Sequence, residues 1–216
     1  MTHHLQTVYL VDDNPDIRWQ LKELLMQHGL HVEVFESAPD FLNHTNWSTP
    51  SVLVSDMRMP GMTGLELQSQ LRTAHHIMPM IFISGESHHQ EIIDAMKGGA
   101  IEFLWKPFSG SQLLEAIHRG MQLSLQAQQH RVRSQHAQQR YQDLSMRERE
   151  ILPYLLRGHG NKSIAASMDV LPDTVKKHRA QIMEKMQVEN LPELIALWTD
   201  LEIPHALISP NSEPLA

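Results

Sequence analysis

The sequence predicts two domains of different fold class. In the first 123 residues, apolar runs of strand length alternate with helical patterns, which indicates an α/β domain built on a doubly wound, five-stranded parallel sheet. From residue 143 onward only short, capped helical patterns follow, which indicates an all-α domain of four helices. The length of 216 residues also exceeds that of one typical domain. We expect domains at 1–123 and 143–203, a helical linker at 124–142 and a disordered tail at 204–216.

Five runs rich in β-branched and apolar residues make up the predicted sheet, and they lie at residues 7–11, 31–35, 51–55, 80–84 and 102–104. Helical patterns separate them, such as the one that carries Ile17, Leu21 and Leu25 and is closed by Gly29. Nearly continuous apolar strands that alternate with helices indicate a parallel sheet covered on both faces, with strand order 2-1-3-4-5. Such a fold places its active site at the carboxyl ends of the strands.

Polar side chains stand at those carboxyl ends. Asp12 and Asp13 follow the first strand, Asp56 the third, Ser84 the fourth and Lys106 the fifth. Three carboxylates brought together repel one another unless a cation neutralises them, and hard oxygen ligands suit Mg²⁺, with Mn²⁺ as the alternative. A carboxylate nucleophile beside a metal, a lysine and a hydroxyl is what phosphoryl transfer requires. One aspartate after a strand is more often a helix cap or turn former, but five matching residues at four strand ends favour an aspartyl-phosphate site.

The runs VDDNPDIR, SDMRMPGMTGLEL, Ser84-Gly85 and GAIEFLWKPF resemble the CheY-like receiver domain of two-component response regulators, across residues 1–123. The resemblance implies that Asp56 accepts a phosphoryl group from a sensor histidine kinase. It also assigns roles to the neighbouring residues: metal ligation to Asp12, Asp13, Asp56 and the backbone carbonyl of Arg58, stabilisation of the phosphoryl group to Ser84 and Lys106, a rotamer switch to Phe103, and tuning of the phosphate lifetime to Arg58 and Glu86. Without the resemblance, Phe103 is equally well explained as a core aromatic.

The segment QAQQHRVRSQHAQQRYQ is free of glycine and proline, which favours an extended helix over a flexible tether. Leu125 and Val132 stand seven residues apart, but the next equivalent position is Gln139, so the pattern gives a coiled coil little support. The segment is either a solvated spacer or a helix that transmits or constrains domain orientation.

The second half carries a series of helix signals. Ser145 and Glu148 form a capping box before an apolar stripe that ends at Gly158. We expect Asn161 to cap the second helix, and Asn190, with a glutamate three residues on, to cap the fourth. Residues 131–185 carry 11 basic and 6 acidic side chains, a balance of +5 that permits DNA binding without proving it.

The runs REREIL, NKSIA and TVKKHRAQIMEKMQV resemble the LuxR-type helix-turn-helix of FixJ/NarL-class regulators across residues 143–200, and the pairing with a receiver is most similar to FixJ-type proteins. This implies binding to duplex DNA, a homodimer that forms on phosphorylation, and RNA polymerase as a partner. A recognition helix in the major groove would present residues near the start of the third helix, and the second helix would add two more. The predicted DNA-contacting residues are Asn161, Lys162, Thr174, Lys176, Lys177, His178, Arg179 and Gln181. A basic cluster taken by itself is more often a solvated helix face.

Three residues depart from the usual helix-turn-helix pattern. Pro153 lies inside the first helix, where we expect a kink. Asp169 occupies a turn position that favours glycine, so we expect a left-handed backbone there. Leu171 replaces a capping side chain before the third helix, a loss of about 1 kcal/mol.

The sequence predicts a regulator and not an enzyme, apart from self-phosphorylation and slow autodephosphorylation at Asp56. The chain has no cysteine, no apolar run of membrane-spanning length and no secretory signal pattern at its start, so we expect a cytoplasmic protein without a membrane partner. The 15 histidines show no ligand spacing, and we assign them no metal. Two alternatives remain: a phosphatase of the haloacid dehalogenase type, which would need a DxD arrangement after the first strand, and an RNA-binding antiterminator, which the capped helices after the linker disfavour.

Overall fold

The computed structural model describes residues 6–76, 78–86 and 88–200, and it forms two compact units, Met1–Gln128 and Gln129–Ala216. The expected tail at 204–216 and the last residues of the second predicted domain lie outside the described residues. In the part of the chain that is described, no helix is both long enough and apolar enough to cross a bilayer.

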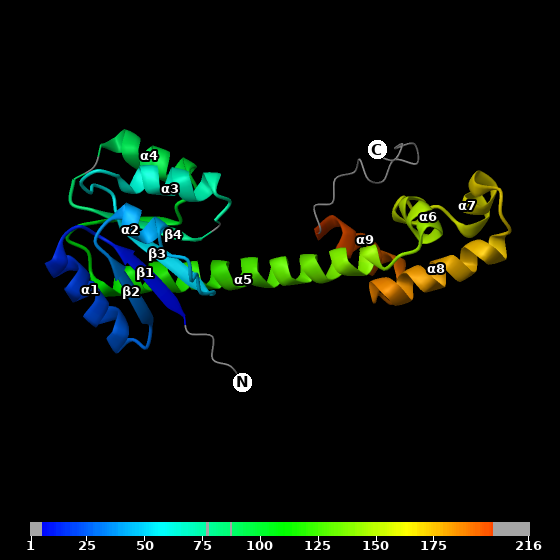
Figure 1. Cartoon of the computed structure of the whole chain (residues 1–216), viewed down its shortest axis with the longest axis horizontal. Coiled ribbons are helices and arrows are strands. Elements are labelled where there is room, and N and C mark those ends of the chain that lie inside the picture. Colours follow the sequence, from blue (N-terminus) through cyan, green and yellow to red (C-terminus); the bar gives the residue numbers. More distant parts are fainter. Residues whose placement is uncertain (1–5, 77, 87, 201–216) are drawn as a thin grey trace. The chain divides into compact units, whose positions relative to one another are not determined.

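The first unit contains a five-stranded parallel sheet in the order β2-β1-β3-β4-β5, which confirms the predicted topology (Figure 1). The strands span Thr7–Val11 (β1), His31–Phe35 (β2), Ser51–Asp56 (β3), Met80–Ser84 (β4) and Glu102–Trp105 (β5). Strands β3 and β5 each run one residue further than predicted. The extra residue on β3 is Asp56 itself, so the phosphoacceptor candidate belongs to the sheet and not to the loop after it.

Helices cover both faces of this sheet. Helix α1 (Pro15–Gln27) and the first part of α5 (Gly110–Gln142) pack on one face, and α2 (Ala38–Leu42), α3 (Gly64–Thr73) and α4 (His89–Lys97) pack on the other. The doubly wound architecture follows from strands that are apolar on both faces: β1, β3 and β4 are buried along their whole length.

Helix α5 is a single helix of 33 residues, so the helical linker predicted at 124–142 is the continuation of the last helix of the first unit. Its first turns bury Leu113, Ile117 and Met121 in the core of the first unit. Its last turns place Ala137 and Tyr141 in the core of the second unit. The predicted linker therefore ends inside a hydrophobic core and is not solvated along its whole length.

The described residues of the second unit add four helices, α6 (Met146–Leu156), α7 (Asn161–Met168), α8 (Pro172–Met186) and α9 (Leu191–Asp200). The capping box at the start of α6 is present, since Glu148 N donates to Ser145 Oγ at 3.3 Å and Ser145 N donates to Glu148 Oε2 at 2.7 Å. At the start of α9, Glu193 N donates to Asn190 Oδ1 at 3.0 Å.

One capping prediction is wrong and two other predictions for the helix ends are confirmed. Asn161 is the first residue of α7, and the extended backbone that defines an N-cap belongs to Gly160, which has no side chain to offer. Asp169 takes the left-handed conformation expected of it, at φ 52° and ψ 51°. Leu171 stands at the N-cap of α8 without a side-chain cap, as expected. Helix α6 runs on past Pro153, which is buried, and the kink expected there stays a prediction.

Candidate functional site

Three of the polar residues predicted to converge at the carboxyl edge of the sheet meet there. Asp12 follows β1 and Asp56 ends β3, and these neighbouring strands pair in register, with Val11 opposite Ser55. The Nζ of Lys106, just after β5, donates to Asp12 Oδ2 at 2.9 Å and to Asp56 Oδ1 at 2.6 Å. Asp12 is completely buried and Asp56 is 6% exposed. One ammonium group thus joins two buried carboxylates from the neighbouring strands β1 and β3.

Backbone groups hold the other two carboxylate oxygens. Arg58 N donates to Asp56 Oδ2 at 2.9 Å and Asn14 N donates to Asp12 Oδ1 at 2.9 Å. A guanidinium NH of Arg18 donates to the carbonyl oxygen of Asp12 at 2.6 Å. Every oxygen of the two carboxylates therefore accepts a hydrogen bond, and both side chains are held in one orientation.

The turn after β3 depends on the absence of a side chain at Gly64. Its N donates to Met57 O at 3.0 Å, which brings the start of α3 against the end of β3. A Cβ at this position would lie 2.5 Å from the carbonyl oxygen of Asp56 and 2.8 Å from the ring of Phe82. Glycine thus permits the close approach that fixes the backbone of Asp56.

Burial and the neighbouring charges shift the pKa values of Asp56 and Lys106. Burial raises the pKa of Asp56 above its ordinary value of 3.8, with the nearby Asp12 carboxylate acting in the same direction, and the bond from Lys106 opposes the shift without cancelling it. Burial alone would lower the pKa of Lys106, but its bonds to Asp56 and Asp12 outweigh burial and raise it. With all three ionised, two carboxylates and one ammonium leave the cluster one negative charge in excess, which favours an additional cation.

The other predicted site residues lie around this cluster. Asp13 is exposed beside Asp12, and Ser84 is buried with its Oγ donating to the carbonyl oxygen of Glu86 at 2.8 Å. Phe103 is half-buried against the α2/α3 face of the sheet, and its ring lies 5.2 Å from that of the exposed Trp105. The sequence reasoning did not find Glu91, whose carboxylate pairs with the side chain of Arg58 at 3.2 Å.

Among the described residues, no three side chains of His, Cys, Asp or Glu are grouped closely enough to hold a metal by themselves. The chemistry of the donors nevertheless fits a hard divalent cation. Asp12 and Asp56 offer buried carboxylate oxygens that retain free lone pairs, Asp13 stands next to them, and the loop after β3 supplies main-chain carbonyls.

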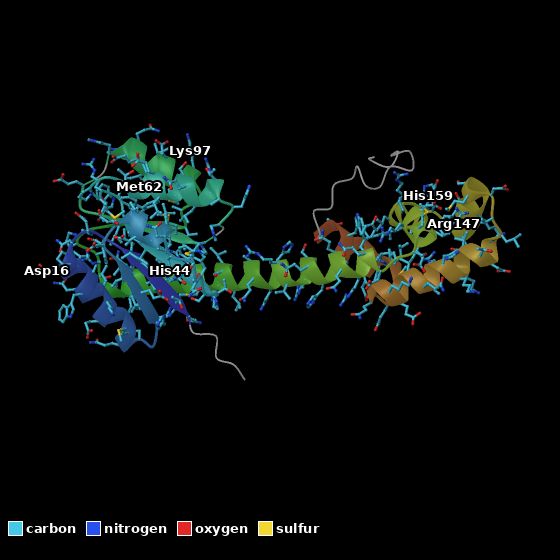
Figure 2. All side chains as sticks on the ribbon, in the orientation of Figure 1. Asp16, His44, Met62, Lys97, Arg147 and His159 are labelled. Atoms are coloured by element: carbon cyan, nitrogen blue, oxygen red, sulfur yellow. The ribbon has the colours of Figure 1, made fainter. Side chains whose placement is uncertain are left out.

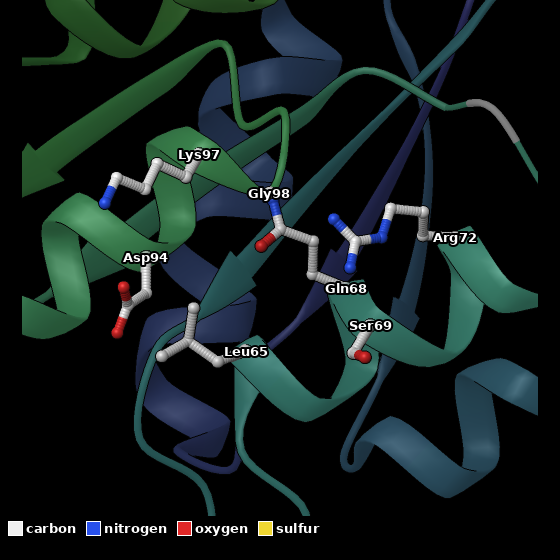
Figure 3. A pocket seen from close by; sticks show the side chains of 7 residues that line it. All are labelled: Leu65, Gln68, Ser69, Arg72, Asp94, Lys97 and Gly98. Atoms are coloured by element: carbon white, nitrogen blue, oxygen red, sulfur yellow. The ribbon is translucent and has the colours of Figure 1, made fainter.

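A separate hollow of about 250 Å³ lies between α3 and α4 and contains none of the predicted phosphoacceptor residues (Figure 3). Gln68 crosses from α3 to α4, where its Nε2 donates to Ala95 O at 3.0 Å. A Cβ on Gly98 would lie 2.3 Å from the Oε1 of Gln68, so Gly98 gives the glutamine its space. The hollow therefore lies beside the hydrogen bond from Gln68 that links α3 to α4.

In the second unit, the predicted DNA-contacting residues differ in solvent exposure. Lys162 on α7 and Lys176 and Lys177 on α8 are exposed. The remaining predicted contacts are half-buried: Asn161, Thr174, His178, Arg179 and Gln181. The Nδ1 of His178 is buried without a hydrogen-bond partner in the described part of the chain, and Arg179 donates to Asn161 Oδ1 at 3.4 Å. The three exposed lysines, Lys162 on α7 and Lys176 and Lys177 on α8, are therefore the predicted contacts most available to a ligand.

Ion pairs and helix-end contacts fix the orientation of α8 and α7. Lys185 Nζ donates to Glu148 Oε2 at 2.7 Å, and Glu148 is only 2% exposed. Burial alone would raise the pKa of Glu148, but its bonds from Lys185 and Ser145 outweigh it and lower the pKa. Arg147, labelled in Figure 2, donates to Met168 O at the end of α7 at 3.2 Å. These contacts hold both helices of the helix-turn-helix against α6.

Comparison with protein families accounts for both units. The family model described as "Response regulator receiver domain" matches residues 8–118, and the model described as "Bacterial regulatory proteins, luxR family" matches residues 142–198. The chain belongs to the two-component response regulators with a LuxR-type output domain. This response regulator is a transcription regulator of that class, and the resemblances found in its sequence are confirmed.

Whole-length relatives agree with this family. The regulator is 38% identical over 202 residues to the response regulator protein TodT of Pseudomonas putida, covering 94% of this chain and 89% of TodT. It is 37% identical over 191 residues to the transcriptional regulatory protein FixJ of Rhizobium meliloti, covering 88% of this chain and 94% of FixJ. A structure of the response regulator StyR matches with a TM-score of 0.78 and 40% identity, over 90% of this chain and 98% of StyR.

Proposed function

We propose that Asp56 is the phosphoacceptor of this response regulator and that its phosphorylation controls binding to promoter DNA. The observation that carries this proposal is the bridge from Lys106 to both Asp56 and Asp12. It sets a nucleophilic carboxylate, a second acidic ligand and a cation at one buried point, as phosphoryl transfer requires. The receiver family implies a histidine kinase as donor.

In the proposed reaction, a carboxylate oxygen of Asp56 forms a bond to the phosphorus of a kinase phosphohistidine. The bond between phosphorus and the histidine nitrogen breaks, and the nitrogen keeps the electron pair. The ammonium of Lys106 lies where negative charge on the transferred group can be neutralised, and the hydroxyl of Ser84 is at the end of the neighbouring strand β4. Because only the ionised carboxylate is nucleophilic, the raised pKa of Asp56 means that uptake falls at a higher pH than it would for an aspartate of ordinary pKa.

Receivers of this family typically bind Mg²⁺ at the acidic pocket. Here Asp12, Asp13, Asp56 and the backbone carbonyl of Arg58 would hold Mg²⁺, or Mn²⁺ in its place. When bound, the cation would supply neutralising charge for the phosphoryl oxygens. The excess negative charge of the cluster supports such a site.

The output half supports DNA binding through α8. The family of the second unit implies a DNA ligand, and Lys176 and Lys177 present positive charge on the outer side of α8. We propose that phosphorylation promotes a dimer that places two copies of α8 on a two-fold site, and that the bound dimer engages RNA polymerase.

A regulator of promoters acts in the cytoplasm, and we propose that location for this protein. We keep the domain bounds 1–123 and 143–203 as proposals.

The test uses the full chain with radiolabelled acetyl phosphate and Mg²⁺, followed by footprinting on genomic DNA. We expect the wild type to retain label and Asp56→Asn to retain none, since the amide is not a nucleophile. Asp40→Asn is the matched control, because Asp40 is an exposed aspartate of α2 outside the site. Label on Asp56→Asn would refute the acceptor assignment, and identical footprints with and without phosphorylation would refute the control of DNA binding.

A further inference from the structure

Arg58 is connected both to the phosphoacceptor and to the first turn of α4. Its backbone N donates to Asp56 Oδ2 at 2.9 Å, so its main chain is fixed beside the acceptor. Its guanidinium points elsewhere and donates to Glu91 at 3.2 Å (Oε2) and 3.5 Å (Oε1). The side chain that could reach a phosphoryl group on Asp56 is thus held by an acidic residue of α4.

Glu91 is itself fixed. Its Oε2 accepts a hydrogen bond from His88 N at 2.7 Å, in the first turn of α4. A glutamate carboxylate is ionised at neutral pH, so its contact with the Arg58 guanidinium is an ion pair. The partner of Arg58 in this structure is Glu91, whereas Glu86 is exposed and its carbonyl oxygen accepts the hydroxyl of Ser84.

We infer that Glu91 is a positioning residue that sets the lifetime of the phosphoryl group on Asp56 by holding the Arg58 guanidinium away from it. The inference rests on the proposed role of Asp56. The Arg58 and Glu91 side chains are 43% and 30% exposed, so the ion pair is weak and easily exchanged. A phosphoryl group carries nearly two negative charges against one on Glu91, so it competes for the guanidinium.

The step under control is hydrolysis of the aspartyl phosphate. A water oxygen forms a bond to phosphorus from the side opposite Asp56, and the bond between phosphorus and the Asp56 oxygen breaks. Asp56 leaves as a carboxylate with the electron pair, inorganic phosphate is released, and the proton of the water passes to that phosphate or to solvent. A guanidinium on the phosphoryl oxygens obstructs the approach of the water, whereas a guanidinium held by Glu91 leaves the approach open. Loss of the Glu91 charge therefore slows hydrolysis.

The test compares the loss of label from full-length protein phosphorylated with radiolabelled acetyl phosphate in Mg²⁺. Glu91→Gln removes the charge but keeps an oxygen for His88 N, since glutamine serves at the same capping position. We expect its phosphoryl half-life to be roughly twofold to fivefold that of the wild type, the range expected for an exposed ion pair. Glu66→Gln is the matched control, because Glu66 accepts from Thr63 N at 2.8 Å in the equivalent first-turn position of α3. We expect it to leave the half-life unchanged.

A second variant separates positioning from a structural effect on α4. In an Arg58→Ala background, Glu91→Gln has no arginine to release, and we expect it to leave the half-life unchanged. Equal half-lives of the wild type and Glu91→Gln would overturn the inference, and so would a longer half-life that persists without Arg58. If the wild type takes up no label, or Asp56→Asn takes up as much, the proposed function fails and the inference fails with it.

Discussion

Removal of the Lys106 ammonium should destabilise the receiver strongly and in a pH-dependent way. Lys106→Met leaves the Asp12 and Asp56 carboxylates facing each other without their shared cation. Breaking a buried ion pair costs about 3–5 kcal/mol. Because 25% of the Lys106 side chain is exposed, we expect the lower end of that range, about 3 kcal/mol.

The sign of the pH dependence follows from Asp56. Its pKa is already raised above 3.8 by burial, and loss of Lys106 removes the opposing effect and raises it further. Between 3.8 and the folded-state pKa, the folded protein binds more protons than the unfolded chain, so folding becomes more favourable as the pH falls. The destabilisation by Lys106→Met should therefore be largest near pH 8 and smaller near pH 5.

Hydrogen exchange of the β1 and β3 amides in the full chain, followed by mass spectrometry, measures the free energy of unfolding of the receiver separately from that of the second unit. A loss of about 3 kcal/mol corresponds to a fall in protection of roughly a hundredfold. Lys97→Met is the matched control, because Lys97 is exposed on α4. Protection at pH 8 equal to that of the wild type would refute the reasoning, as would a larger loss at pH 5 than at pH 8.

Three further predictions follow from the packing. Gly64→Ala forces a Cβ against backbone and should cost about 1–3 kcal/mol and slow phosphoryl uptake, and an unchanged melting temperature with normal uptake would contradict the close approach. Glu148→Gln removes the charge that pairs with Lys185 of α8 and should lower the free energy of unfolding by about 1–3 kcal/mol at pH 7. This loss should become smaller as the pH falls from 4.5 towards the lowered folded-state pKa, because the stabilisation exists only while the carboxylate is ionised. Thermal unfolding at pH 7 and pH 3.5 checks that the loss is smaller at pH 3.5. A fragment of residues 129–216 should fold and bind DNA, whereas one of 143–216 should melt far lower by circular dichroism because it lacks the last turns of α5.

The sheet was predictable from sequence because its three inner strands, β1, β3 and β4, are buried on both faces, and a continuous apolar run bounded by polar residues leaves little freedom in placing a strand. The meeting of Asp12, Asp56 and Lys106 followed from the same reasoning, because parallel strands end at one edge. The sequence did not determine which of two adjacent aspartates is buried. Successive side chains of an extended chain point in opposite directions, and it is Asp13 that is exposed.

The pairing of Arg58 with Glu91 was outside the reach of such reasoning. The two residues are 33 positions apart, and they lie in a loop and a helix, where no strand register fixes their approach. A local signal did exist for Glu91, because a glutamate three residues after an N-cap position indicates the start of a helix. Nothing in the sequence says that the same carboxylate also receives an arginine from the loop after β3. The prediction that Asn161 caps α7 was wrong because a glycine just before a helix can occupy the N-cap position without a capping side chain, as Gly160 does.

Helix α5 explains why the boundary between the domains was the hardest feature to predict. A capping box at Ser145 indicates correctly where α6 begins, but the start of a helix is not the start of a hydrophobic core. Ala137 is completely buried and the ring of Tyr141 lies 5.3 Å from that of Trp198, although both residues stand in a polar, glutamine-rich segment. Arg140 also donates to Met186 O, at the end of α8, at 3.3 Å. Because isolated apolar residues in a polar helix give little periodic signal, their membership of the second core becomes visible only from their contacts. The last turns of α5 are therefore part of what holds α8 in place.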